Sequence, residues 1–263
     1  MVRKLMKHEL HALFRVLGPV AIAAFVFAIV GRILLTVQVN NPETNAALVS
    51  VIVIFYMFAI LWLVIAAYGL GISRFYKTLF TGEGYMTLSL PATPVQIIWA
   101  KLLSAIIGIF FAGIVAILSF ITLFLGWDAA VMQEFADFFY TLFTVIGELI
   151  ESQPVQFVEF ILIAIVNLPL WLLVCYAVIS IGQCFTARRK GVTYLIAIAL
   201  YMGASIFYAL VFTPFMMNLQ LQYDSVTVAH ITNAINFALC LLIDIVCFLI
   251  VRYILRNKVN LIA

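Results

Sequence analysis

The amino-acid sequence predicts an all-α integral membrane protein with six transmembrane helices, and three observations lead to this fold class. Hydrophobic residues make up 67% of the 263-residue chain and charged residues only 10%, against roughly 45–50% and about 25% in soluble globular proteins. A soluble fold of this size has too few interior positions to hide so much apolar surface. The scarce charges also separate six long uncharged stretches, and almost all basic residues fall on one side of them.

The uncharged stretches set the predicted spans within a single domain, residues 1–263. A hydrocarbon core of roughly 30 Å needs about 20 apolar helical residues. The first stretch reaches this length only by enclosing Arg32, and the last only by enclosing Asp244. Helices are expected because β-barrel strands would show alternating segments of about ten residues. The predicted spans are about 17–38, 46–72, 102–125, 157–184, 192–213 and 231–254.

The basic residues predict the topology. Thirteen of the fourteen Lys and Arg side chains fall on one side of a six-span arrangement, and Arg32 is the exception. By the positive-inside rule that side is cytoplasmic, so both termini are expected inside. No small-residue cleavage site closes the first apolar segment, so this span is expected to be retained. The four cysteines are expected to be reduced, since none lies in an outer loop.

Residues 1–16, at the N-terminus, predict a basic amphipathic helix on the cytoplasmic leaflet. Polar side chains recur there at three- and four-residue steps, and apolar ones fill the opposite face. The helix is expected to lead into the first span near Gly18-Pro19. It is either a membrane anchor or a lever that responds to a cytoplasmic partner. His8 and His11 lack a further ligand for a metal, so a solvated face is expected.

A second amphipathic helix is predicted over residues 129–152, between the third and fourth spans. Acidic and threonine side chains recur there at steps of three and four, opposite an apolar face. A seventh span is the alternative, but four acids on one stripe are costly in hydrocarbon. An odd number of spans would also send the C-terminal basic cluster outside. We expect an interfacial helix on the outer side of the membrane. Its acidic face is either simply solvated, or it covers an outer opening, or it contacts a cationic substrate.

The loop of residues 74–101, between the second and third spans, carries most of the information about function. Two prolines, Pro91 and Pro94, interrupt it before the third span begins. Proline is favoured in the first turn of a helix and threonine at the cap before it. Thr93 is therefore expected to cap the third helix, with Pro94 at its first position. The second span is expected to end near Arg74.

A short helix is predicted to lie across the cytoplasmic face over residues 83–90. Apolar side chains exposed on such a helix indicate a docking surface for another protein, and contact with the bilayer is the alternative. The residues expected on this surface are Glu83, Gly84, Tyr85, Met86, Leu88, Leu90, Pro91 and Pro94.

Four short motifs in this loop are similar to a known family signature. They are Glu83-Gly84, Leu88-Ser89-Leu90-Pro91, Pro94-Val95 and Lys101-Leu102-Leu103. Together with the six spans, the cytoplasmic termini and the amphipathic N-terminal helix, they resemble type-2 ATP-binding cassette (ABC) exporter permeases in their six-span stand-alone bacterial form. The motifs lie around the coupling helix of that family. Two departures are Gln96, where a small polar residue is usual, and the long outer segment 129–152.

The resemblance implies the membrane-spanning permease subunit of an ABC exporter in the plasma membrane. A separate ATP-binding subunit would dock on residues 83–90, and ATP and magnesium would bind to that partner. A second permease chain, identical or similar, would complete the pathway within the membrane lipid. The sequence contains no Gly-Lys-Ser or Gly-Lys-Thr, the motif that binds phosphate. No ATPase activity, catalytic residue or cofactor is therefore expected in this chain. No nucleic acid is expected as a partner. The substrate is expected to be hydrophobic or amphipathic.

Three polar groups stand out within the predicted spans, namely Arg32, Asn167 and Asp244. Ionisable groups inside a membrane are functional candidates by default. Arg32 lies near the outer end of its span and can extend to the interface. An Arg32–Asp244 pair is expected, with a substrate or proton role for Asp244 as the alternative. Two other functions remain open: a non-transporting six-span anchor or sensor for an ATP-binding partner, and a proton-coupled secondary carrier.

Overall fold

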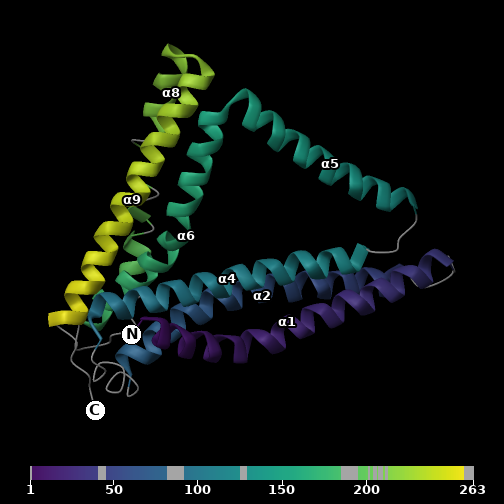
Figure 1. Cartoon of the computed structure of the whole chain (residues 1–263), viewed down its shortest axis with the longest axis horizontal. Coiled ribbons are helices and arrows are strands. Elements are labelled where there is room, and N and C mark those ends of the chain that lie inside the picture. The colour runs from purple at the N-terminus through teal and green to yellow at the C-terminus, as the bar shows by residue number, and fades with distance from the viewer. Residues whose placement is uncertain are drawn as a thin grey trace. The chain divides into compact units, whose positions relative to one another are not determined.

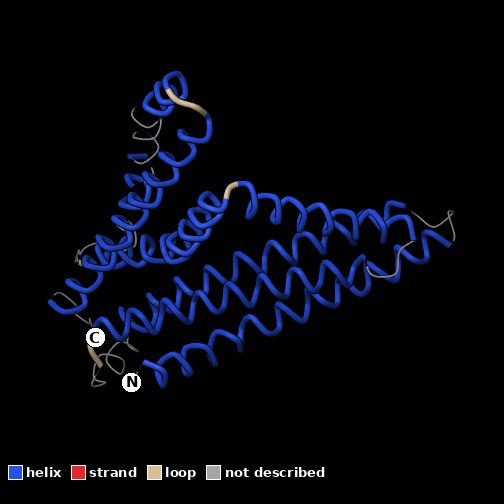
Figure 2. The backbone as a smooth tube through the Cα atoms, turned by 45° about the horizontal axis from the view of Figure 1, so that its top comes forward, coloured by secondary structure: helices blue, strands red, loops and turns tan. Residues whose placement is uncertain are grey.

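The structure is a computed structural model that describes residues 2–40, 46–81, 92–124, 129–184, 195–200, 202–203, 206, 210 and 213–257. Over these residues the chain is helical apart from short turns, and they contain no strand, which confirms the all-α prediction. Figure 1 and Figure 2 show that the described residues form mainly long helices. The helices are α1 (Val2–Asn40), α2 (Ala46–Phe80), α4 (Pro94–Phe124), α5 (Ala129–Ser152), α6 (Pro154–Gln183), α8 (Thr213–Gln222) and α9 (Ser225–Asn257).

Five helices in the described part of the chain are long and apolar enough to cross a membrane: α1, α2, α4, α6 and α9. They coincide with five of the six predicted spans, so the chain is a multi-pass helical membrane protein. The remaining predicted span, 192–213, lies largely outside the described residues, although residues 195–200 within it are helical. The helix α5 has the bounds predicted for the outer amphipathic helix and is not among the five.

Two helix boundaries differ from the prediction. No boundary occurs near Gly18-Pro19, because α1 is one helix from Val2 to Asn40 with Pro19 inside it. Proline removes one backbone hydrogen bond, but buried residues on both sides of it hold the helix in place. The second helix continues beyond Arg74 to Phe80, because Phe75 and Leu79 in its last turns are fully buried. The location of residues 1–16 on the membrane surface stays a prediction.

The chain divides into two compact units, each of which is described by itself. Unit 1 comprises Met1–Ser73 and Trp99–Glu148, and unit 2 comprises Arg74–Ile98 and Leu149–Ala263. Unit 1 therefore contains α1 and most of α2 and α4, whereas unit 2 contains α6, α8 and α9 with the last turns of α2 and the first turn of α4.

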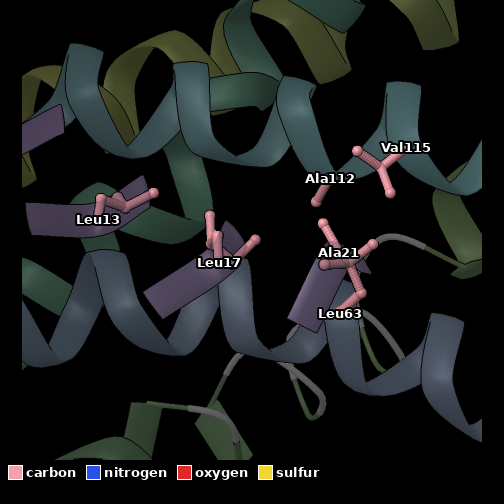
Figure 3. Close-up of a cluster of buried hydrophobic side chains, with 7 residues drawn as sticks. Leu13, Leu17, Ala21, Leu63, Ala112 and Val115 are labelled. Atoms are coloured by element: carbon pink, nitrogen blue, oxygen red, sulfur yellow. The ribbon is translucent and has the colours of Figure 1, made fainter. Parts of the chain in front are cut away.

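In unit 1, α1, α2 and α4 pack around a shared cluster of buried side chains, which Figure 3 shows. Alanines at the contacts let the three backbones approach closely, which is the usual packing of helices in membranes. Leu13 of α1 lies beside Gly108 of α4, and further along both helices a second cluster joins Ala28, Tyr56 and Leu123. Hence α1 and α4 run in the same direction and α2 runs in the opposite one.

In unit 2, α6 and α9 pack side by side along their length (Figure 1). Glu159 of α6 contacts His230 of α9, and Asn167 contacts Cys240 further along. Because the contacts advance together on both helices, α6 and α9 run in the same direction. At the other end of the unit, the ring of Phe75 in α2 stacks on Tyr176 of α6, with centroids 3.9 Å apart.

Replacing Leu17 with Ala is expected to destabilise unit 1, because this side chain is fully buried between three helices. A cavity left by such a change costs about 2 kcal/mol or more. The matched control is Ile22→Ala, on the same helix but 64% exposed, where lipid or detergent fills the space. Thermal unfolding of the purified protein should show a lower melting temperature for Leu17→Ala only. Equal losses would contradict the packing described above.

Candidate functional site

The structure describes only one of the eight residues predicted to form the docking surface. Glu83, Gly84, Tyr85, Met86, Leu88, Leu90 and Pro91 lie outside the described residues. Pro94 is described and is the first residue of α4, as predicted. The docking surface itself stays a prediction, and the described residues that flank it carry the local geometry.

The start of α4 is closed by a reciprocal cap. The backbone N–H of Gln96 donates to Thr93 Oγ1 at 3.4 Å, and the backbone N–H of Thr93 donates to Gln96 Oε1 at 3.2 Å. This is a capping box, in which the side-chain oxygen of each residue accepts a hydrogen bond from the backbone N–H of the other. Neither N–H has a partner within the helix. It confirms Thr93 as the cap, and it gives a physical reason for Gln96, the residue that departs from the family pattern.

Two turns further along α4, Lys101 forms a buried ion pair with Glu9 of α1. The Lys101 Nζ and Glu9 Oε1 atoms are 2.6 Å apart, and the two side chains are only 3% and 7% exposed. The motif comparison singled out Lys101, but Glu9 was missed. A signal was present: Glu9 stands three and four residues from Met6 and Leu13, on the apolar stripe of the N-terminal helix. An acid in such a stripe requires a buried partner.

A polar cluster joins α6 and α9 near their N-terminal ends. The carboxylate of Glu159 contacts His230 Nδ1 through Oε1 at 2.8 Å, and it accepts a hydrogen bond from Asn233 Nδ2 through Oε2 at 2.9 Å. Both carboxylate oxygens therefore have partners. The side chains of Glu159 and His230 are 24% and 34% exposed, so the cluster is accessible from one side of the helix pair.

The polar contacts continue along the same helix pair. The thiol of Cys240 lies 3.3 Å from Asn236 Oδ1 and 3.7 Å from Asn167 Oδ1, and its single S–H donates to one of them at a time. Asn167 lies two residues before Pro169, and its side-chain amide also donates a hydrogen bond to the backbone carbonyl of Ile163. We call the set of Glu159, Asn167, His230, Asn233, Asn236 and Cys240 the polar seam.

Asp244 lies one turn beyond Cys240 on α9, inside the span. Its Oδ1 atom is buried and has no hydrogen-bond partner among the residues that the structure describes. The predicted partner, Arg32, belongs to the other unit, so the Arg32–Asp244 pair stays a prediction. Asp244 precedes Arg252 by eight residues, which corresponds to about 12 Å along the helix. The carboxyl group is therefore well inside the apolar segment.

Most residues of the polar seam were missed from the sequence. Asn167 and Asp244 stood out because long apolar runs surround them, whereas Glu159 was treated only as the boundary of such a run. The spacing of polar residues in the last predicted span could have indicated the polar seam. His230, Asn233, Cys240 and Asp244 follow one another at steps of three, seven and four, which places polar side chains on one face of an apolar helix.

The seam can hold two helices together and can present donors and acceptors inside the membrane. Hydrogen bonds between membrane helices contribute about 0.6 kcal/mol each on average, so the seam stabilises the parallel arrangement of α6 and α9. Within the described part of the chain no group of three or more His, Cys, Asp or Glu residues is placed to hold a metal ion.

Breaking the buried ion pair of unit 1 is expected to destabilise the protein. Lys101→Met or Glu9→Gln removes one charge of the pair whose atoms lie 2.6 Å apart, and breaking a buried ion pair costs about 3–5 kcal/mol. The double variant Glu9→Gln/Lys101→Met should recover most of this loss, because neither charge remains. Thermal unfolding of the four proteins measures the coupling, and Lys4→Met on the exposed face of α1 is the control. Additive effects of the two single changes would exclude a coupled pair.

No family model, no curated protein and no solved structure matches this chain. Its function is therefore argued from its own residues. The features available for this are the capped start of α4, the Glu9–Lys101 pair, the polar seam and the unpartnered oxygen of Asp244.

Proposed function

We propose that the chain is the membrane-spanning permease subunit of an ABC exporter, which uses ATP hydrolysed by a separate subunit docked on residues 83–90. The observation that carries the proposal is the buried Glu9–Lys101 pair. It fastens the N-terminal helix to α4 a short distance after the docking loop. A permease that transmits motion from a cytoplasmic partner to its spans requires a link of this kind.

The proposed mechanism follows from the stiffness of these elements. The docking loop leads directly into the capped first turn of α4, so a displacement of the loop moves the end of this helix. Seven residues after Pro94, the Lys101–Glu9 pair transmits the motion to α1. Separating a buried ion pair costs several kcal/mol, so α1 and α4 move together.

The partners follow from what the chain itself holds. Without a phosphate-binding motif in the sequence, the proposal assigns ATP and magnesium to the partner subunit. It also includes a second permease chain, identical or similar, which completes the pathway. Large apolar side chains on the outer surfaces of α1, α2 and α9 are exposed in the single chain, and lipid or this second chain would cover them.

The proposal includes six spans, with both termini on the cytoplasmic side of the plasma membrane. Because α6 and α9 run in the same direction, the chain must return between them, and a helical span over 192–213 provides that return. In unit 1, α2 runs opposite to α1 and α4, so its C-terminal end and their N-terminal ends would face the same side of the membrane. In unit 2 this end of α2 contacts the C-terminal half of α6 through Phe75 and Tyr176. The basic residues that flank these ends would then share one side.

Purification of the solubilised protein from its host is expected to bring down an ATP-binding subunit. Glu83→Ala and Leu88→Ala should reduce this co-purification about tenfold or more, because they remove contacts at the centre of the proposed docking surface. Tyr253→Ala, exposed on α9, is the control that should leave it unchanged. Recovery of the intact permease without any ATP-binding subunit, or docking that is insensitive to both loop variants, would refute the proposal.

The topology is tested with a single cysteine at position 140 in a variant whose four native cysteines are replaced by Ala. Tyr140 is 74% exposed on α5, so a cysteine there is accessible to reagents. A membrane-impermeant maleimide should label intact cells at this position from outside, and a cysteine at Lys4 should be labelled only after permeabilisation. Labelling of position 140 only from the cytoplasmic side would contradict the proposed topology.

A further inference from the structure

Unit 2 contains two acidic residues within its described spans, and their surroundings are opposite. Glu159 has a hydrogen-bond partner for each carboxylate oxygen, supplied by His230 and Asn233. Asp244 has a buried oxygen with no hydrogen-bond partner among the described residues. A carboxyl group inside a membrane is costly unless a partner compensates it, and such groups mark substrate or ion pathways. Asp244 therefore needs a partner that the described residues of its unit do not provide.

The described helices that pack against α9 offer no positive charge from a Lys or Arg side chain. Both α6 and α8 contact α9, and neither contains a Lys or Arg residue. On α9 itself the nearest basic residue is Arg252, about 12 Å away along the helix axis. The thiol of Cys240, one turn away, lies within reach of Asn236 and Asn167 instead.

The surroundings of Asp244 also indicate the chemical class of the partner. A small hydrated cation such as Na⁺, Mg²⁺ or Ca²⁺ needs several oxygen ligands, and the described residues contain no cluster of three or more acidic, His or Cys side chains that could hold a metal. The sequence of α9 around the carboxyl group is apolar instead. Leu241, three residues before Asp244 and on the same face of the helix, is 39% exposed. One carboxylate within an apolar surface is complementary to a single positive charge on an apolar body.

We propose that Asp244 binds the charged centre of a hydrophobic organic cation, while apolar side chains on the same face of α9, such as Leu241, contact the rest of the molecule. This names the substrate class of the proposed exporter and rests on that proposal. The binding step itself requires only this chain. A carboxyl group that is protonated in the empty site releases its proton when the cation arrives, so the charge of the site stays balanced.

The experiment measures binding of tetraphenylphosphonium to the purified chain in nanodiscs without an ATP-binding subunit, by equilibrium dialysis. The wild-type chain should bind this cation, and Asp244→Asn should weaken binding about tenfold or more, since an ionic contact in an apolar site is lost. Asp244→Glu should retain binding. Tetraphenylborate, which has the same shape and the opposite charge, should not bind more tightly to the wild-type chain than to Asp244→Asn.

Glu159→Gln is the matched control, because this carboxylate is already engaged by His230 and Asn233 and should not contribute to cation binding. Equal binding by the wild-type chain and Asp244→Asn, or equal losses in Glu159→Gln and Asp244→Asn, would overturn the proposal. Binding that emerges only in Arg32→Gln would also overturn it, because Arg32 would then neutralise Asp244 within the chain. Thermal unfolding of each variant shows that it is folded.

The result is independent of the partner. If the chain binds the cation through Asp244 but no ATP-binding subunit co-purifies with it, the exporter proposal fails and the site stands. If the subunit co-purifies and the cation does not bind, the site fails and the exporter proposal stands.

Discussion

The structure depends on one constraint: inside a membrane, polar groups must find their partners within the protein, because no water is available to them. The contacts between helices show how this chain meets it. In unit 1, Glu9 pairs with Lys101, and Tyr56 shares a buried hydrogen bond with Ser119. In unit 2, Glu159 binds two side chains of α9. Each of these contacts joins residues far apart in the sequence and so sets which helices are neighbours.

The same constraint distinguishes the residues that stabilise the fold from the candidate for binding. A polar group whose partners are all present needs nothing further, and the Glu9–Lys101 pair and the Glu159 cluster belong to this class. A buried polar group without a partner calls for an explanation, such as a ligand or an ion. In the described part of unit 2, the Oδ1 atom of Asp244 is a buried polar atom without a hydrogen-bond partner. Asp244 is therefore the candidate for binding.

Much of the fold could be predicted from the sequence, because helix formation in a membrane depends on local composition. A long apolar run must be helical to satisfy its backbone, so five apolar helices and the helix α5 were predicted, although several of the observed helices extend beyond the predicted spans. Thr93 and Pro94 also act locally, through the cap of the helix that they begin. The continuation of α1 through Pro19 and of α2 to Phe80 was missed, since burial against other helices decides both.

The sequence by itself determined that this is a multi-pass helical membrane protein, where its apolar helices lie, and that Lys101, Asn167 and Asp244 are unusual. These conclusions rest on composition and spacing, which are properties of short segments. Only the tertiary structure decided that Lys101 meets Glu9 and that Glu159 meets His230 and Asn233. It also showed that an oxygen of Asp244 has no hydrogen-bond partner among the described residues. A hydrogen bond acts over about 3 Å, so its partner is known only once separate helices have been packed together.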